Sequence, residues 1–531
     1  MIYNKVICIA VQAPLVYLSS SCISRDYNNG GTVCVCNGTY CDYIGKIPKV
    51  KYPQVLVYTS NMEGLRFQKT NASFQNISAE LRDSADIIIE SHRTYQKVFG
   101  FGGAFTDATG INVETLKDDA REHLMKSYFS NDGIQYNVGR VPIGGTDFST
   151  KYYSYDDGEP DPSLKKFALN SADTNYKIPC IKVAHNLTHG KLKLIASAWT
   201  APKWMKTNGA YHGGTLKPEM YQAWADYYVK FFNEYKKQGI KFWGVTTGNE
   251  PSLAKYPLSL FQKLASIGWT ANTLAQWVEE ALGPTLHKSG YGDLNIMALD
   301  DQRFYLTWFI DRIFKNEAAK NYINGTAVHW YFDTVFPAKL LSQLHYKYPD
   351  KFIISTEACK GNAQVTAKNK QEMKFLFFSQ IIGFFLSRGV LLGSWSRGED
   401  YAQDIIEDMR NWVIGWIDWN MALNPGGGPT FLNNVVDSPI VVNGSANEFY
   451  KQPMYYAMGH FSKFVPRDSV RIESSQSSKV WSIAFKRPDH AITVVLLNRG
   501  KVDQDITIVD SEKGTLTLTV SEHSITTLLY W

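Results

Sequence analysis

Short β-rich runs alternate with longer helical patterns between residue 99 and about residue 423, and this rhythm limits the fold more than any other feature of the chain. Strands that are separated by helices pair in parallel, and eight such strands close into a (β/α)8 barrel. We therefore predict an α/β fold of the TIM-barrel type. The eight expected strands cover residues 98–102, 136–142, 192–197, 242–247, 295–299, 327–331, 352–356 and 412–416.

The segment from Pro218 to Gly239 illustrates the helical half of this repeat. Its large apolar and aromatic residues recur at spacings of three and four, which is the period of one helix face, and a glycine ends the pattern. Such a stripe could be a ligand platform, but on the outer ring of a barrel we expect it to pack into the core. The stripe consists of Met220, Trp224, Tyr227, Tyr228, Phe231, Phe232 and Tyr235.

Alternating short strands without intervening helices follow residue 463, at 480–485, 492–497, 506–509, 515–520 and 525–530. Five strands alone leave exposed edges, and further strand candidates at 55–58 and 87–89 complete a sandwich. We therefore predict a barrel inserted in an all-β module formed by the two ends of the chain. The predicted units are the sandwich (48–95 and 464–531), the catalytic barrel (96–423 and 453–463) and an N-terminal β segment (22–47) that pairs with about 424–452.

The cysteines indicate the secretory route, because Cys22, Cys34, Cys36 and Cys41 crowd into twenty residues. This spacing is typical of a disulfide-stapled segment, whereas a zinc knuckle, the alternative, is disfavoured by the lack of histidines. Residues 1–21, which include Cys8, are interpreted as a signal peptide. Cys180 and Cys359 remain as buried thiols. Six glycosylation sequons agree with secretion, at Asn37, Asn71, Asn76, Asn186, Asn324 and Asn443.

Charge and hydropathy exclude several classes of partner. The net charge is only +5 at pH 7 and no Lys/Arg block occurs, so we expect no nucleic-acid binding. Mild basicity suits contact with an anionic surface such as acidic lipid. The chain has no uninterrupted run of eighteen apolar residues, so any membrane contact is expected to be peripheral.

Two glutamates mark the expected carboxyl ends of barrel strands: Glu250 in KFWGVTTGNEP and Glu357 in KFIISTEAC. In a TIM barrel the catalytic side chains lie at this face. Cleavage of a glycosidic bond requires one carboxylic acid to protonate the leaving oxygen and one carboxylate to attack or stabilise the sugar carbon. We therefore predict a sugar-cleaving enzyme with Glu250 as the acid and Glu357 as the nucleophile, and no metal or cofactor.

Other polar and aromatic residues fall at the same expected face. Arg140 is the predicted electrostatic partner of Glu357, which Tyr331 and His329 would orient. Asn249 would donate to a sugar 2-hydroxyl. Taken singly, each of these residues is as well explained by a turn or by core packing; their joint placement at strand ends carries the prediction. The remaining members of the set are Asp147, Trp199, Asp301, Trp419 and Asn434.

Nine segments resemble one known family, the lysosomal acid β-glucosidases or glucosylceramidases of glycoside hydrolase family 30. They are FGFGGAFTDATG, VGRVPIGGTDFS, ASAWTAPKWMKTNGA, TTGNEPS, LDDQR, AVHWYFD, STEAC, GWIDWNMALNP and YKQPMYYAMGHFSKFVP. The resemblance implies a retaining hydrolase that removes glucose from glucosylceramide by double displacement, with Glu250 as acid/base and Glu357 as nucleophile. By motif, it also implies glucose contacts from Arg140, Asp147, Trp199, Asn249, Tyr331, Trp419 and Asn434.

The same resemblance implies a cellular setting for the protein. It implies disulfides between Cys22 and Cys34 and between Cys36 and Cys41, residence in the lysosome, and activation by a saposin-type protein on anionic lipid. Two alternatives stay open: a β-glycosidase for another glycolipid or a sterol glucoside, and an inactive carbohydrate- or lipid-binding relative.

The chain departs from the family pattern in three places. Gly248 replaces the family's glutamate two residues before the acid/base, and the following loop is shorter, with Leu258 where an aromatic residue is usual. The stretch between Cys359 and Trp395 is longer than expected and contains an apolar segment at about 373–393. A gene-model error, a lid or membrane-dipping element, and a species-specific helix are the three explanations.

Overall fold

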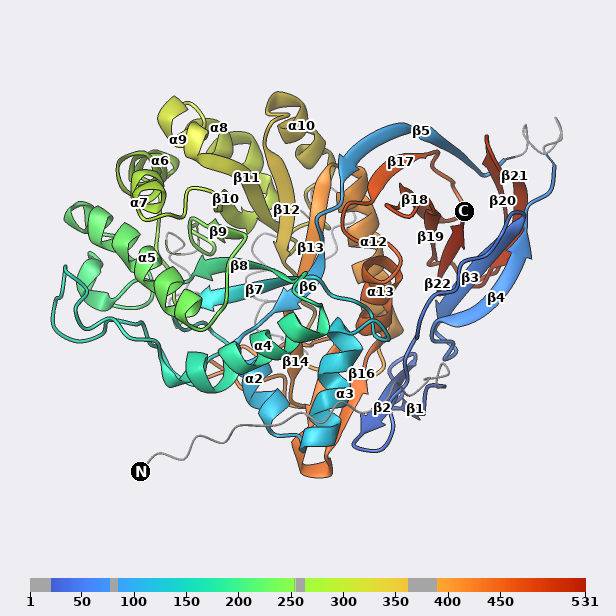
Figure 1. The fold of residues 1–531 in the computed structure, drawn as a ribbon, viewed down its shortest axis with the longest axis horizontal. Coiled ribbons are helices and arrows are strands. Elements are labelled where there is room, and N and C mark those ends of the chain that lie inside the picture. Colours follow the sequence, from blue (N-terminus) through green and yellow to red (C-terminus); the bar gives the residue numbers. More distant parts are fainter. Residues whose placement is uncertain (1–20, 77–84, 253, 255–262, 362–388) are drawn as a thin grey trace, which may run out of the picture.

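The computed structural model describes residues 21–76, 85–252, 254, 263–361 and 389–531 (Figure 1). The predicted signal peptide before residue 21, the aromatic position at Leu258 and most of the long apolar stretch lie outside the described residues. In the described part, no helix is long and apolar enough to cross a membrane.

Eight parallel strands form a closed barrel in the order β10-β11-β12-β13-β6-β7-β8-β9. The predicted TIM barrel is confirmed, and each predicted strand overlaps an observed one, with the ends shifted by up to four residues. The strands are β6 (Gly100–Ala104), β7 (Val138–Ile143), β8 (Lys193–Ala198), β9 (Gly244–Thr246), β10 (Asn295–Gln302), β11 (Ile323–His329), β12 (Phe352–Glu357) and β13 (Val413–Asn420).

Apolar side chains from six of these strands fill the barrel interior, as packing inside a closed sheet requires. Glycine allows the closest approach at the seam between β6 and β7, where a Cβ on Gly102 would lie 1.8 Å from the carbonyl oxygen of Val138. The interior residues are Val138, Ile195, Met297, Ala327, Ile354 and Ile417.

Helices surround the barrel, and the predicted aromatic helix is α5 (Tyr221–Lys237). Its aromatic stripe is buried from Trp224 to Tyr235. This confirms the prediction that the stripe packs into the core and does not form a ligand platform. The other α-helices of the described chain are α2 (Asp107–Glu114), α3 (Asp118–Phe129), α4 (Ile178–Leu187), α6 (Ala271–Trp277), α7 (Gly283–Lys288), α8 (Asp311–Ile313), α9 (Glu317–Tyr322), α10 (Lys339–Lys347), α12 (Trp395–Arg410) and α13 (Pro453–Ser462).

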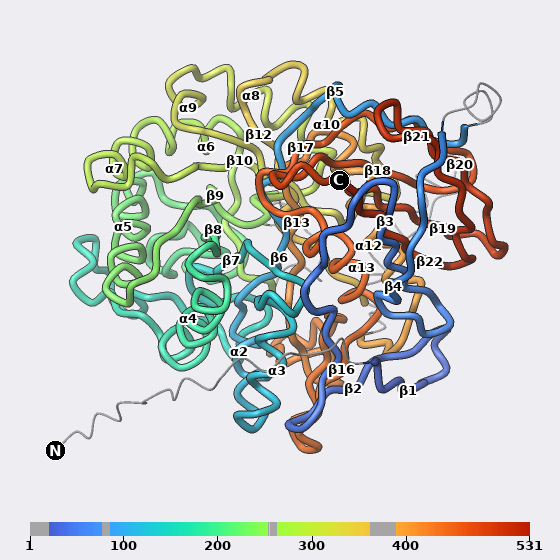
Figure 2. Tube along the Cα trace, turned by 45° about the vertical axis from the view of Figure 1, so that its right-hand side comes forward, coloured from blue at the N-terminus to red at the C-terminus, as the bar shows by residue number. Residues whose placement is uncertain are grey.

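Both ends of the chain build one nine-stranded sheet beside the barrel (Figures 1 and 2). The sheet curls around its own apolar core, because Gln75 beyond β4 bridges Thr515 of β21. Sequence analysis missed two of the strands, β4 and β17. In sheet order the strands are β21 (Gly514–Val520), β20 (Gln504–Asp510), β5 (Ile87–Lys97), β17 (Val470–Ser474), β18 (Trp481–Lys486), β19 (Ile492–Asn498), β22 (Ser524–Tyr530), β3 (Gln54–Asn61) and β4 (Gln68–Ser73).

Helices α12 and α13 join the two units. The Arg410 side chain at the end of α12 donates from Nε to the carbonyl oxygen of Ser482, at 2.7 Å. His460 of α13 hydrogen-bonds through its two ring nitrogens to Thr527 and Ser60 of the sheet. These buried polar contacts fix the sandwich against the outside of the barrel.

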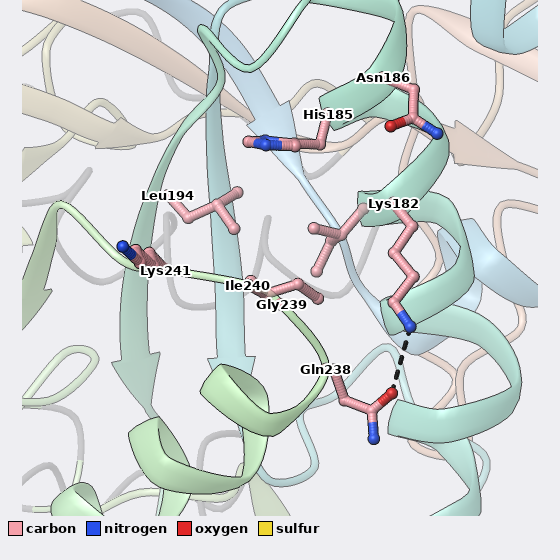
Figure 3. Close-up of a pocket in the computed structure, with 9 residues that line it drawn as sticks. Lys182, His185, Asn186, Leu194, Gln238, Gly239, Ile240 and Lys241 are labelled. Carbon is pink, nitrogen blue, oxygen red and sulfur yellow. Dashed lines mark hydrogen bonds between the residues drawn. The ribbon is translucent and has the colours of Figure 1, made fainter.

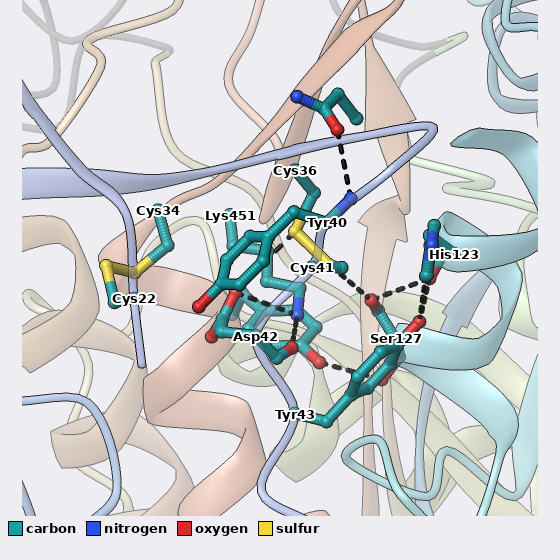
Figure 4. Close-up of a disulfide and its surroundings, with 12 residues drawn as sticks. Cys22, Cys34, Cys36, Tyr40, Cys41, Asp42, Tyr43, His123, Ser127 and Lys451 are labelled. Carbon is teal, nitrogen blue, oxygen red and sulfur yellow. Dashed lines mark hydrogen bonds and ion pairs between the residues drawn. A yellow bond between two sulfur atoms is a disulfide. The ribbon is translucent and has the colours of Figure 1, made fainter. Parts of the chain in front are cut away.

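A smaller sheet contains the disulfide-bonded segment (Figure 4). The structure has both implied disulfides, Cys22–Cys34 and Cys36–Cys41. The strand order of this sheet is β1 (Ser24–Asp26), β2 (Thr32–Asn37), β16 (Glu448–Lys451), β15 (Ile440–Asn443) and β14 (Ala422–Leu423). Residues 34–37 of β2 pair with residues 448–451 of β16. The exact domain boundaries stay a prediction.

Candidate active site

Glu250 and Glu357 meet at the carboxyl face of the barrel. Glu357 is the last residue of β12, and Glu250 follows β9 with a left-handed backbone, at a φ of 44°. One carboxylate oxygen of each residue and one ring nitrogen of His329 lie within 4.8 Å of one another. Non-glycine residues rarely adopt a positive φ, and such strained positions are common in active sites.

Both carboxylate oxygens of Glu357 receive hydrogen bonds. The guanidinium of Arg140 donates to Oε2, and the phenol of Tyr331 donates to Oε1 at 2.9 Å. Arg140 has no solvent exposure, and Glu357 is 6% exposed. These hydrogen bonds to both oxygens fix the orientation of the Glu357 carboxylate.

Asp300 holds the opposite side of this network, although sequence analysis named its neighbour Asp301 instead. Its Oδ2 accepts from Nη2 of Arg140 at 2.8 Å, and its Oδ1 lies 3.0 Å from Nε2 of His329. Three hydroxyl groups also donate to this carboxylate, from Ser197, Thr246 and Thr356. Burial alone would raise the pKa of Asp300, but Arg140 and His329 outweigh it and hold the pKa well below its usual range.

A β-bulge in β10 places Asp300 in this position. The pairing of β10 with β11 shifts register between Leu299 and Asp301, and both Leu299 and Asp300 have positive φ angles. An extra residue in a strand re-aims the side chains beyond it. The bulge sends Asp300 into the barrel, whereas Asp301 accepts from the backbone amides of Ser252 and Gln302.

Glu250 is held through one of its two oxygens. Gln302 Nε2 lies 2.9 Å and His329 Nδ1 lies 3.0 Å from the same atom, Oε1. Burial raises the pKa of Glu250, and the contact with His329 opposes this rise. The predicted role of His329 therefore needs correction, since its two ring nitrogens bond to Glu250 and Asp300 and it is Tyr331 that contacts Glu357.

His329 carries a positive charge in this arrangement. Burial lowers its pKa, but the charge of Glu357 and the hydrogen bonds to Asp300 and Glu250 raise it to about 10. Both nitrogens then carry protons that point at carboxylates. The trio of Glu250, His329 and Glu357 is therefore part of a hydrogen-bonded network that also includes Asp300.

The remaining predicted residues surround the two glutamates. Asn249 Oδ1 accepts from Arg140 at 2.8 Å, and Asn434 Nδ2 donates to Asp147 Oδ2 at 2.8 Å. Burial and the nearby charge of Glu357 raise the pKa of Asp147 to about 7.

Trp199 and Trp419 stack on each other, with ring centroids 5.0 Å apart, and the guanidinium of Arg140 lies 4.7 Å from the Trp199 ring centroid. Each indole covers part of the other, so the pair forms one wall of the site.

A surface hollow elsewhere on the barrel differs from this site (Figure 3). It lies near the start of β8, at the opposite end of that strand from Trp199, and it is lined mainly by α4 and by the residues that follow α5. Its lining residues, which include Lys182, His185 and Gln238, contain no carboxylate. This hollow therefore lacks the pair of carboxyl groups that glycosidic cleavage requires.

A closed barrel with two adjacent carboxyl groups at the carboxyl ends of its strands is typical of enzymes that cleave glycosidic bonds. Residues 98–465 match the glycosyl hydrolase family 30 TIM-barrel domain, and residues 468–528 match the family 30 β-sandwich domain. The chain is therefore a glycoside hydrolase that belongs to family 30.

Three known proteins illustrate the similarity. The chain is 37% identical to the lysosomal acid glucosylceramidase of Mus musculus, over 97% of this chain and 96% of the mouse protein. The SrfJ protein of Salmonella typhimurium superposes with a TM-score of 0.79 at 25% identity, over 90% of this chain and 99% of that protein. An endo-β1,6-glucanase superposes with a TM-score of 0.75 at 25% identity and the same coverage.

Sequence analysis missed three contributors to the site: Asp300, Gln302 and Cys359. Asp300 and Gln302 lie in the motif LDDQR, but only the bulge decides which of its side chains faces inward. The buried Cys359 has its Sγ 3.4 Å from the hydroxyl of Tyr331. Of the glycosylation candidates, Asn71, Asn76, Asn186 and Asn324 are exposed and Asn37 and Asn443 are half-buried, and their modification stays a prediction.

Proposed function

We propose that this protein hydrolyses glucosylceramide to glucose and ceramide with retention of configuration at the anomeric carbon. The observation that carries the proposal is the separation of at most 4.8 Å between carboxylate oxygens of Glu250 and Glu357. Retaining glycosidases hold these groups about 5 Å apart, whereas inverting enzymes leave about 6.5–9.5 Å for a water molecule.

The first step forms a covalent bond between Glu357 and the sugar. A carboxylate oxygen of Glu357 attacks the anomeric carbon while the bond to the ceramide oxygen breaks, and Glu250 gives its proton to that oxygen. Arg140 and Tyr331 hydrogen-bond to Glu357 and orient it for the attack. Since Gln302 and His329 both contact Oε1 of Glu250, the proton is assigned to Oε2.

The second step reverses the role of Glu250. Having lost its proton, Glu250 takes one from a water molecule, which attacks the anomeric carbon and releases Glu357 and β-glucose. The contact between His329 and Glu250 stabilises the ionised glutamate at this stage, because the imidazolium donates to Oε1. Protonated and ionised Glu250 are therefore both accessible during one turnover.

The side chains around the glutamates would hold the glucose. Arg140 donates a hydrogen bond to the side-chain carbonyl oxygen of Asn249. The amide nitrogen of Asn249 can then donate to the 2-hydroxyl. The hydrogen-bonded pair of Asp147 and Asn434 offers partners for outlying hydroxyls, and the Trp199 and Trp419 wall offers an apolar surface.

The similarity to the mouse lysosomal enzyme supports the lipid substrate and a lysosomal location. We include in the proposal a glycosylated protein that makes peripheral contact with anionic lipid and is activated by a saposin-type protein. The net charge of +5 favours such a surface. No nucleic acid and no cofactor enter the proposed reaction.

Labelling with a cyclitol epoxide, a mechanism-based reagent, tests the nucleophile. We expect one equivalent of label on Glu357 by peptide mass spectrometry, loss of activity in parallel, and protection by glucose. NMR of the freshly released sugar should show the β anomer first. Folded enzyme that stays unlabelled, or that releases α-glucose first, would contradict the proposal. Paired glucosyl and galactosyl ceramides test the sugar and separate this function from that of another β-glycosidase.

A further inference from the structure

An aromatic rim, consisting of Tyr152, Tyr211 and Phe431, lies next to the glucose wall. The rings of Tyr152 and Tyr211 stack with centroids 5.3 Å apart, and Phe431 meets Tyr152 edge to face at 4.5 Å. All three side chains are half-buried, so part of each ring remains accessible. They come from the loops after β7, β8 and β14, which meet at the carboxyl face of the barrel.

The inner end of the rim is continuous with the predicted glucose contacts. Tyr152 packs against the buried cluster that contains Trp199 and Trp419. The amide of Phe431 donates to the carbonyl oxygen of Ser149, and the neighbouring Thr430 hydroxyl donates to the carbonyl oxygen of Asp147 at 2.7 Å. The rim therefore begins where the glucose site ends.

The outer end of the rim is hydrogen-bonded to Lys263 and Ser266, which follow Glu250 in the chain. The phenol of Tyr152 donates to the carbonyl oxygen of Lys263, and the amide of Ser266 donates to the carbonyl oxygen of Tyr211 at 3.1 Å. Lys206 Nζ joins the same two segments through the carbonyl oxygens of Tyr211 and Ser266. The amide of Trp269 in turn donates to the carbonyl oxygen of Pro251, the neighbour of Glu250, at 3.3 Å. Because a general acid lies on the side of the departing oxygen, these residues mark the leaving-group side of the site.

The chemistry of the rim favours an apolar ligand over a second sugar. The Tyr152 hydroxyl is occupied by Lys263, and the Tyr211 hydroxyl hydrogen-bonds to Asp157. Phe431 has no polar atom in its side chain. A sugar ring needs several hydrogen-bond partners, whereas alkyl chains need only apolar surface.

We propose that Tyr152, Tyr211 and Phe431 form the site for the apolar part of the leaving group, next to the bond that is cleaved. This inference deepens the proposed function and depends on it for the assignment of the leaving-group side. The rim would lower the barrier to cleavage of lipid glucosides by holding the first methylene groups of the lipid, and it would contribute nothing when the leaving group is small.

A series of alkyl β-glucosides from methyl to octyl tests the rim without requiring glucosylceramide as the substrate. We expect kcat/KM of the wild-type protein to rise about thirtyfold along the series, since each buried methylene adds to binding. Tyr152→Ala and Phe431→Ala should each reduce this rise to about threefold. β-Glucosyl fluoride, which has no organic leaving group, should be cleaved by both variants at rates within about twofold of wild type.

Two controls separate the role of the ring from damage to the fold. Tyr152→Phe keeps the ring and should retain the chain-length dependence. Tyr346→Ala removes a tyrosine that is 72% exposed on α10, and it should leave every substrate unchanged. Thermal melting of each variant reports the stability of the fold.

Each alternative result has a definite meaning. An equal loss on octyl glucoside and glucosyl fluoride would show that the rim only supports the loops, and an unchanged chain-length dependence would show that it is not used; either outcome overturns the inference. Gentiobiose, in which the leaving group is a second glucose, is one further substrate. If the variants lose activity on gentiobiose alone, the rim is a sugar subsite, and this result also overturns the inference. Wild-type protein that follows the alkyl series but does not cleave glucosylceramide would overturn the proposed substrate and leave the rim supported.

Discussion

Nδ1 of His329 lies 3.0 Å from Oε1 of Glu250, and the other ring nitrogen of His329 lies 3.0 Å from Asp300. One imidazolium thus connects Glu250, the proposed acid, to Asp300, whose pKa is held below its usual range. The pKa shifts of Glu250 and Asp300 both depend on this contact with His329. Burial raises the pKa of Glu250, whereas the positive charge of His329 limits the rise.

Replacement of Glu250 by glutamine tests the acid/base assignment. We expect kcat/KM for glucosylceramide to fall by about 10³-fold, because the ceramide oxygen leaves poorly without a proton. Formation of the covalent intermediate from 2,4-dinitrophenyl glucoside should change little, since that leaving group needs no proton. Added azide should restore turnover and give β-glucosyl azide, because an anion needs no general base. Equal losses on both substrates, without rescue by azide, would contradict the assignment.

The pH dependence should follow the ionisation of Glu250. A group whose folded pKa is raised keeps its proton to a higher pH, so activity that requires the protonated acid is present at low pH and is lost as pH rises through that pKa. His329→Gln removes the positive charge that lowers the pKa, and the alkaline limb of kcat/KM should therefore move to higher pH. The control is the pH-rate profile on glucosyl fluoride, whose cleavage needs no acid. On this substrate the alkaline limb should be the same in the wild type and in His329→Gln.

Asp300→Asn should damage catalysis more than binding. The substitution removes a charge that Arg140 and His329 both contact, and both cations are buried. We expect kcat to fall about a hundredfold with KM within about threefold, because Arg140 and His329 position the two glutamates. The protein should also lose about 3 kcal/mol of stability. Steady-state kinetics and urea unfolding measure the two effects.

Asp301→Asn is the matched control for Asp300→Asn. Burial and the charge of Glu250 raise the pKa of Asp301 to about 7, so the neutral side chain is already populated near that pH. We therefore expect a loss of activity below about tenfold. A larger loss for Asp301→Asn than for Asp300→Asn would contradict the network described by the hydrogen bonds.

Barrel strands were predictable from the sequence because they are buried on both faces and separated by long helices. Strand β4 was missed for the opposite reason: its sequence QKTNAS is polar and mostly exposed, so it lacks the apolar alternation of a strand. Pairing with β3 decides its structure, and that contact lies outside any local window.

The types of residue at the strand ends could be predicted from the sequence, but the direction in which their side chains point could not always be predicted. A strand that alternates regularly fixes the face of each side chain, and Arg140 follows that rule. Glu357 does not, because the pairing of β11 with β12 shifts register just before it. The bulge at Leu299 breaks the alternation, and nothing in the motif LDDQR shows that Asp300 and not Asp301 faces Arg140. The direction in which His329 points depends on the same bulge, because Asp300 is its partner.

A buried acidic cluster outside the active site should make the fold more stable in acid. Asp333, Asp404 and Asp408 surround the single guanidinium of Arg303, with the nearby Glu407 adding further negative charge. Burial raises the pKa of Asp404 from 3.8 to about 6 and raises those of Asp333 and Asp408 well above the usual range. These three carboxyl groups therefore bind more protons in the folded than in the unfolded chain, so the stabilisation that they contribute is present at low pH and is lost as pH rises.

Thermal melting between pH 4 and pH 8 measures this effect. The contribution of the cluster to the Tm should fall as pH rises above about 4, and Asp404 alone should account for about 3 kcal/mol of stability. Asp408→Asn supplies a neutral side chain of the same shape, so it should flatten the decline and raise the Tm at pH 7 relative to wild type. Glu90→Gln, at an exposed surface pair, should leave the profile unchanged. A variant at Asp408 that keeps the wild-type slope would show that the cluster does not take up protons on folding.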